Sequence, residues 1–169
     1  MNYISHYDSP LGGITLGSDG EALTALQFDG EKYFAEILGK EYEIKDLPAF
    51  AKAREWLDIY FSGKDPGFIP PIELKTTPFR KAVCEIMLTI PYGQTMTYGQ
   101  IAEMIASKRE IARMSAQAVG GAVGHNPISL IIPCHRVVGS NGSLTGYGGG
   151  LDKKAALLKL EGVDMGRNE

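Results

Sequence analysis

Residues 131–138 read Ile-Ile-Pro-Cys-His-Arg-Val-Val, so a cysteine and a histidine directly follow an apolar run that ends in proline. Pro133 cannot donate to a sheet and fixes its own φ, so we expect the chain to leave regular structure there and expose the Cys134 sulfur. A thiol becomes a useful nucleophile where an imidazole favours the thiolate, and His135 supplies one. A buried cysteine at a strand end is the alternative, and is commoner for an isolated Cys in apolar surroundings. The two polar residues after the cysteine count against it.

The composition describes a globular protein without a membrane segment. The 169 residues are 44% apolar, which is enough to bury a core in one ordinary domain or two small ones. No apolar stretch approaches the roughly 20 residues of a membrane helix, and the first residues lack the pattern of a signal peptide. We therefore expect a cytoplasmic protein with no membrane contact. Cys84 and Cys134 do not resemble a disulfide framework, so both are expected to be reduced, with Cys84 filling the core.

The formal net charge of −3 argues at first against nucleic acid, because a DNA-binding surface must supply cations that displace counterions from phosphates. The two halves of the chain differ, however. Residues 1–75 carry seven Lys and Arg against thirteen Asp and Glu, a balance of −6, whereas residues 76–169 carry ten against seven, a balance of +3. Only the second half is expected to face a polyanion. Two solvated surfaces of unrelated composition would explain the same difference.

The N-terminal half has the pattern of a small α/β domain. Residues 3–7, 13–16 and 22–28 alternate apolar and polar side chains like the strands of an antiparallel meander. Residues 48–61 begin with proline and place apolar side chains at helical spacing, which predicts a helix over the sheet. Residues 63–75 contain the run Asp-Pro-Gly-Phe-Ile-Pro-Pro and are interpreted as a connecting segment that ends the domain.

The C-terminal half has the pattern of a helical domain. Thr77 and Pro78 predict the start of a helix that Pro91 ends. Thr97 is expected to cap a second helix, and Ser115 a third that consists mainly of alanine and glycine. The last two helices, separated by a polar turn, have the outline of a helix-turn-helix. Periodicity alone favours an ordinary pair of packed helices, because a small-residue helix approaches another helix as closely as it approaches a DNA groove.

A wider set of residues resembles one known family. The matching positions run from about residue 79 to 162 and are Ala118-Val119-Gly120-Gly121-Ala122, Asn126-Pro127, Pro133-Cys134-His135-Arg136-Val137-Val138, Gly142, Gly146-Tyr147-Gly148-Gly149-Gly150-Leu151, Leu157-Leu158 and Glu161-Gly162. This pattern resembles the O6-alkylguanine-DNA alkyltransferases, also called methylated-DNA:protein-cysteine methyltransferases. The resemblance implies an α/β two-domain fold, with a small N-terminal ribonuclease-H-like α/β domain in residues 1–75. Residues 76–165 would form a C-terminal helical, winged-helix-like domain that contains the helix-turn-helix.

The resemblance implies that Cys134 removes the alkyl group from O6 of a damaged guanine and keeps it. His135, oriented by the Glu161 carboxylate, would favour the thiolate in a relay whose logic is that of a protease triad. A bridging water is expected between Cys134 and His135, because consecutive side chains contact each other poorly. Asn126 would orient the same network through its amide. The product is a thioether, which offers no carbonyl for water to attack, so each molecule is expected to react once.

The family binds double-stranded DNA through the minor groove and rotates the damaged nucleotide out of the stack. In the family, an arginine of the small-residue helix fills the gap; Gln117 stands at that position here, and Arg113 lies one turn earlier. We expect Gln117 to fill the vacated stack and Arg113 to contact phosphate, with the reverse assignment as the alternative. Ser115, Ala116 and Gly120 complete the expected DNA surface.

The substrate pocket implied by the resemblance contains Tyr98, whose hydroxyl is expected to donate to guanine N3 and ease departure of the purine. A buried core tyrosine is the alternative. Tyr147 is expected to wall the pocket, and Gly148 stands where some members of the family carry serine. Val137 and Ser129 lie in segments that flank the cysteine and are expected to line the same pocket.

No cofactor is expected, and no metal site, because the histidines and cysteines lack the paired spacings of metal ligands. A single-turnover reagent needs no second subunit, so a monomer is expected. A DNA-binding regulator or damage sensor is one alternative function, and the complete cysteine motif counts against it. A cysteine hydrolase is another, since Cys, His and Glu also run acyl transfer. The Cys-His adjacency and the helix-turn-helix count against the hydrolase.

Overall fold

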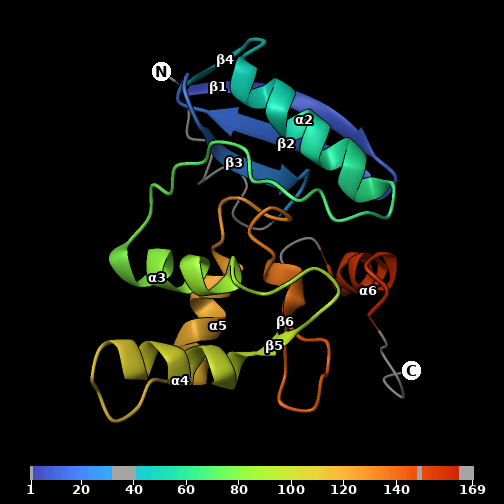
Figure 1. The fold of residues 1–169 in the computed structure, drawn as a ribbon. Coiled ribbons are helices and arrows are strands. Elements are labelled where there is room, and N and C mark those ends of the chain that lie inside the picture. Colours follow the sequence, from blue (N-terminus) through green and yellow to red (C-terminus); the bar gives the residue numbers. More distant parts are fainter. Residues whose placement is uncertain (1, 32–40, 148–149, 164–169) are drawn as a thin grey trace. The chain divides into compact units, whose positions relative to one another are not determined.

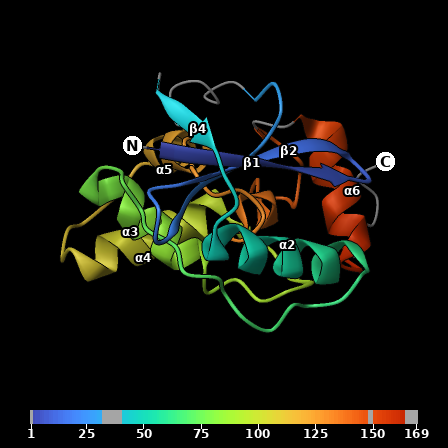
Figure 2. The same cartoon turned by 90° about the horizontal axis from the view of Figure 1, so that it is seen from above.

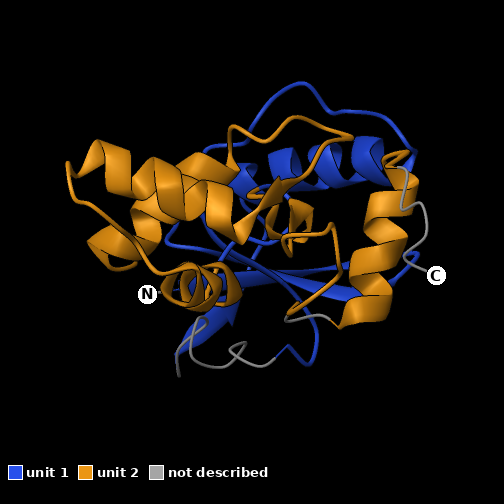
Figure 3. Cartoon of the chain, turned by 90° about the horizontal axis from the view of Figure 1, so that it is seen from below, with its two compact units in different colours: residues 1–75, 127–131 blue, residues 76–126, 132–169 orange. Residues whose placement is uncertain are grey.

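The chain divides into two compact units (Figure 3). The first contains residues 1–75 and 127–131, and the second contains residues 76–126 and 132–169. The structure is a computed structural model that describes residues 2–31, 41–147 and 150–163. Within this described part of the chain, no helix is both long enough and apolar enough to cross a membrane.

Unit 1 is built on a four-stranded sheet. Its strands are β1 (Asn2–Ser9), β2 (Gly12–Ser18), β3 (Leu23–Phe28) and β4 (Tyr42–Ile44). They lie in the order β3-β2-β1-β4, with β2 antiparallel to both β1 and β3, and β4 parallel to β1. The predicted meander is confirmed. The short strand β4 is not predicted, because its three residues are all exposed and are too few to show the alternation of a half-buried strand.

The helix α2 (Pro48–Phe61) packs against β1, β2 and β3 and lies along one face of the sheet (Figure 1, Figure 2). Its bounds are those predicted from the sequence. Its first residue is a proline, which suits a first turn because the N–H there has no partner within the helix. The side chains of Phe50 and Leu57 are buried. Each contributes roughly 1.5–3 kcal/mol to stability by leaving water.

The outer edge of β3 pairs with two short segments from elsewhere in the chain. Leu23 exchanges backbone hydrogen bonds with residues 71–73. Farther along the strand, the N–H of Leu26 donates to the Pro127 carbonyl and the N–H of Ser129 donates to the Leu26 carbonyl, both at 2.9 Å. The segment that carries these two residues therefore belongs to unit 1, although the chain on both sides of it belongs to unit 2.

The described part of unit 2 combines four α-helices with a short 3-10 helix and a two-stranded parallel sheet. These elements are α3 (Pro78–Met87), β5 (Met96–Thr97), α4 (Tyr98–Lys108), α5 (Ala116–Gly124), the 3-10 helix η1 (Cys134–Arg136), β6 (Val137–Val138) and α6 (Leu151–Leu160). Helices α3, α4 and α5 pack on one another, and α6 packs against η1 (Figure 1). Helix α3 ends before the predicted stop at Pro91, because the N–H groups of Thr89 and Ile90 bond in tighter three-residue turns.

Three polar side chains mark where α3, α4 and α5 begin. The Thr77 hydroxyl accepts a hydrogen bond from the first turn of α3. Thr97 and Gln100 form a capping box at the start of α4, in which each side chain accepts from the backbone N–H of the other. The Ser115 hydroxyl accepts from two N–H groups of α5. All three predicted caps are confirmed, and each contributes about 1 kcal/mol.

Candidate active site around Cys134

The helix η1 holds Cys134 in the interior of unit 2. The cysteine is only 5% exposed, so the prediction that its sulfur is exposed is wrong. Its N–H donates to the Ile132 carbonyl at 2.8 Å, which closes a tight three-residue turn centred on Pro133. The residues on both sides of the turn are buried and apolar, so the turn is drawn inward with them.

His135 is fully buried and pairs with Glu161, the residue that ends α6. Its Nε2 lies 2.5 Å from Oε2 of Glu161. Burial lowers the pKa of His135 below its usual value, and this outweighs the opposing effect of the carboxylate. The imidazole is therefore neutral at pH 7. Since Nε2–H donates to Glu161, Nδ1 is the basic nitrogen that can take a proton.

Arg136 is the member of this cluster that sequence reasoning missed. Its Nε donates to Oε1 of Glu161 at 2.8 Å, and its Nη2 donates to Oε2 at 3.2 Å. Its Nη1 donates to the Ile90 carbonyl at 2.8 Å, so both ends of the guanidinium are held. An arginine inside an apolar run is the signal that could have found it, because buried arginines require a carboxylate partner.

Glu161 is the centre of the network. Besides His135 and Arg136, its Oε1 accepts from the backbone N–H of Gly93 at 2.9 Å. Burial alone would raise the pKa of this carboxyl, but the hydrogen bonds from His135 and Arg136, together with the charge of Arg136, lower it to about 2. The carboxylate is therefore charged at neutral pH and is balanced by one guanidinium.

Asn126 follows α5 and is buried. Its Nδ2 donates to the Ile132 carbonyl at 2.8 Å. The same carbonyl accepts the N–H of Cys134. The amide thus fixes the turn that carries the nucleophile. The predicted role of Asn126 in orienting the network of Cys134, His135 and Glu161 stays a prediction.

Tyr98 and Lys154 meet at one backbone carbonyl. The Tyr98 hydroxyl donates to the Thr145 carbonyl at 3.0 Å, and the Lys154 ammonium donates to the same oxygen at 2.7 Å. Lys154 Nζ also lies 5.8 Å from the centre of the Tyr98 ring. Burial lowers the pKa of Lys154 to about 8, while the charge of Cys134 opposes that shift. Sequence reasoning missed Lys154 because a lysine is normally solvated.

The other predicted pocket residues lie in different parts of the chain. Val137 is buried in β6, and Tyr147 is partly buried in the loop before α6. Gly148 lies outside the described residues. Ser129 is buried and belongs to the segment of unit 1 that pairs with β3.

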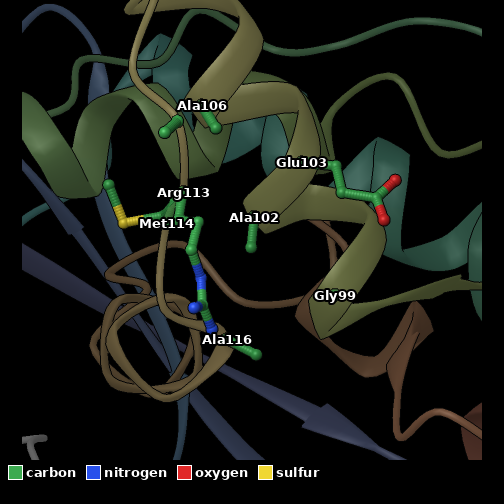
Figure 4. Close-up of a pocket in the computed structure, with 8 residues that line it drawn as sticks. Gly99, Ala102, Glu103, Ala106, Arg113, Met114 and Ala116 are labelled. Atoms are coloured by element: carbon green, nitrogen blue, oxygen red, sulfur yellow. The ribbon is translucent and has the colours of Figure 1, made fainter.

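The predicted DNA surface lies at the start of α5. Ser115, Ala116 and Gln117 are exposed there, whereas Gly120 is partly buried near the Tyr98 ring. Arg113 is exposed in the preceding turn and lines a cavity of about 270 Å³ between this turn and α4. Figure 4 shows its side chain extending toward Ala116.

No group of three or more His, Cys, Asp and Glu side chains within the described residues is arranged to hold a metal ion. The cluster around Cys134 contains a thiol, a neutral imidazole, a balanced ion pair, a phenol and a buried ammonium.

Comparison with known proteins links both halves of the chain to one family. Residues 78–163 match the DNA binding domain of 6-O-methylguanine DNA methyltransferase, and residues 2–74 match the ribonuclease-like domain of the same protein. The predicted two-domain fold class is thereby confirmed. Similar solved structures include the Mycobacterium tuberculosis protein in complex with DNA, with a TM-score of 0.82 and 42% identity over 94% of this chain and 92% of that one.

Curated relatives give the same result. The methylated-DNA--protein-cysteine methyltransferase of Mycobacterium tuberculosis (strain H37Rv) is 44% identical, covering 92% of each chain. The protein of that name from Methanosarcina acetivorans is 41% identical over 95% of this chain and 98% of its own. The sequence resemblance is confirmed: the chain belongs to the 6-O-methylguanine DNA methyltransferase family, whose members are the methylated-DNA--protein-cysteine methyltransferases.

Proposed function

We propose that this protein repairs DNA by transferring the alkyl group of O6-alkylguanine to the sulfur of Cys134, once per molecule. The observation that carries the proposal is the buried pair of His135 and Glu161 beside Cys134, with Nε2 and Oε2 2.5 Å apart. This pair leaves a basic Nδ1 on the residue next to the nucleophile. Family membership supplies the substrate class.

The reaction follows from these groups. His135 takes the thiol proton at Nδ1, through a water where the two side chains do not meet. The thiolate attacks the alkyl carbon, the S–C bond forms as the C–O6 bond breaks, and the electron pair moves onto the purine. Tyr98 then gives up its hydrogen bond to the Thr145 carbonyl and transfers its proton to guanine N3. The leaving group is therefore a neutral guanine, which stays in the DNA strand. The thioether offers no carbonyl for hydrolysis, which makes the protein a stoichiometric reagent.

The duplex must deliver the base to a buried sulfur, so the nucleotide has to leave the stack at a cost of a few kcal/mol. We assign this task to α5, which would enter the minor groove. Gln117 would occupy the vacated position and Arg113 would contact phosphate, with Ser115, Ala116 and Gly120 against the backbone. The exposure of Gln117 and Arg113, and the DNA complex known for the M. tuberculosis relative, support this assignment.

The pocket for the flipped base would be lined by Tyr98, Val137, Tyr147 and Gly148. One chain supplies the nucleophile, the base and the acid, so we propose that the protein acts as a monomer. We also propose that it works in the cytoplasm without a cofactor.

Intact-mass spectrometry tests the proposal directly. The wild-type protein is mixed with a duplex oligonucleotide that carries one O6-methylguanine. We expect a gain of about 14 Da per chain, the mass of CH2, which stops at one equivalent of lesion. The Cys134→Ser variant should gain nothing, whereas Cys84→Ser should gain the same mass as wild type. An unmodified wild-type chain that binds the duplex would indicate a damage sensor instead, and repeated turnover on an ester would indicate a hydrolase.

A further inference from the structure

We propose that the ammonium group of Lys154 is the cation that stabilises the Cys134 thiolate, an inference that rests on the proposed role of Cys134 as the nucleophile. His135 then accepts the thiol proton and passes it on to solvent, because burial disfavours a charged imidazole. Lys154 acts through Cys134, so it is a positioning residue rather than a catalytic one.

The burial of Lys154 calls for a counter-charge. The residue is 0% exposed on α6, which is rare for lysine. Its Nζ donates to the Thr145 carbonyl at 2.7 Å, a neutral acceptor. Among the described residues, no carboxylate lies within ion-pair distance of it. A buried cation without an anion is expensive, so an anion that forms nearby is strongly favoured.

Cys134, on the element that packs against α6, is the group that becomes an anion in the proposed reaction. Helix α6, which carries Lys154, packs against η1, which carries Cys134. The charge of Cys134 raises the pKa of Lys154 and so favours its charged form. The interaction is mutual, because two coupled groups stabilise each other's charge equally, so Lys154 lowers the free energy of the thiolate.

The other cations of the site are already engaged. Arg136 is bound to Glu161 through Nε and Nη2, which makes that pair neutral as a whole. Burial lowers the pKa of His135, so its imidazole is neutral at pH 7. The His135, Arg136 and Glu161 network therefore carries no net charge. Among the described residues of this site, Lys154 is the cation that is bound to a neutral carbonyl and not to a carboxylate.

The titratable groups that interact with Lys154 are Tyr98 on α4 and Cys134 and His135 on η1. Tyr98 is neutral at physiological pH, since burial raises its pKa. Cys84, on α3, stays a thiol because burial raises its pKa to about 12. A change in thiol titration after substitution of Lys154 thus reports on Cys134.

The test measures the pKa of the Cys134 thiol in the full-length protein without DNA. Alkylation by iodoacetamide is followed across pH by intact mass in wild type, Lys154→Met, Lys154→Arg and Lys159→Met, with Cys134→Ser as the blank. Lys159 is exposed on the same helix and is the matched control. In Lys154→Met we expect the thiol pKa to rise by at least about one unit, which lowers the alkylation rate at pH 6 about tenfold. At high pH the rate should equal that of wild type.

Lys154→Arg should keep most of the wild-type profile, and Lys159→Met should keep all of it. A Lys154→Met profile that superimposes on wild type overturns the proposal, provided that circular dichroism shows a folded protein. A second measurement covers a variant that does not fold. In Cys134→Ser, the pKa of Lys154, followed by NMR of its 13Cε, should fall relative to wild type, and an unchanged value also overturns the proposal.

The outcome is separable from that of the proposed function, because neither measurement uses alkylated DNA. A shifted thiol pKa without methyl transfer from DNA would sustain the role of Lys154 and refute the repair activity. Methyl transfer with an unshifted thiol pKa would sustain the repair activity and refute the role of Lys154.

Discussion

The ion pair between Arg136 and Glu161 should make a large contribution to stability that a double-mutant cycle can measure. The variants are Arg136→Met, Glu161→Gln and the double substitution. Arg136 Nε and Glu161 Oε1 are 2.8 Å apart, and the side chains are 9% and 0% exposed. At this distance and an effective dielectric constant of about 20, two unit charges attract by about 6 kcal/mol, from which desolvation of both groups must be subtracted.

Each single variant leaves one buried charge without its partner, so each should lower the free energy of unfolding by about 3–5 kcal/mol. The double variant removes both charges and should cost much less than the sum, which leaves a coupling energy of about 3 kcal/mol. The assay is urea unfolding at pH 7.5. An m-value equal to that of wild type checks that the folded states are comparable.

The exposed pair Lys52 and Glu55 provides the matched control. Its Nζ and Oε2 lie 3.3 Å apart, but the side chains are 60% and 53% exposed. The same cycle there should give a coupling below about 1 kcal/mol, because water screens the charges. Additive effects for Arg136 and Glu161, or a coupling no larger than that of the surface pair, would refute the reasoning.

Three further predictions concern the reaction. Gln117→Ala should slow single-turnover methyl transfer from duplex DNA more than from single strands, because only the duplex leaves a gap to fill. Arg113→Ala should weaken DNA binding and reduce the slope of log affinity against log salt concentration by about 1. If Arg113 fills the gap instead, the two variants should exchange these effects. Tyr98→Phe should slow methyl transfer about 100-fold and leave iodoacetamide alkylation unchanged, and equal losses in both assays would contradict its role as an acid. Because burial lowers the pKa of His135 below 6.5, the imidazole remains neutral and able to accept a proton at pH 6.5. The rate should therefore hold at that pH and fall only at lower pH, and a fall beginning above pH 7 would contradict it.

Local features of this fold follow from the sequence because their causes lie within a few residues. Thr77, Thr97 and Ser115 cap helices with side chains that reach N–H groups two or three positions away. The apolar spacing of residues 48–61 fixes the length of α2 in the same way. The three-residue strand β4 escapes prediction, because three exposed residues are too few to indicate a strand and the pairing with β1 is a long-range contact.

The site is predictable only in part, because its electrostatics depend on contacts between distant residues. The cysteine motif identifies Cys134 and His135, but the burial of the sulfur depends on the packing of neighbouring runs. Arg136 and Glu161 are 25 residues apart, and only the folded chain joins them. Lys154 had a local signal that went unused: it shares helical spacing with Leu157 and Leu158, which places a lysine on the buried face of α6.

The short segment around Pro127 and Ser129 means that the sheet of unit 1 is completed late in synthesis of the chain. The backbone partners of Leu26 in β3 lie about a hundred positions further along the chain, so a ribosome releases this strand long before its neighbour exists. During that interval one end of the nascent sheet offers unsatisfied backbone groups to other polypeptides. A fragment that stops after residue 75 would leave these backbone groups of β3 unpaired. A peptide covering residues 127–131, added as a separate molecule, should pair with them.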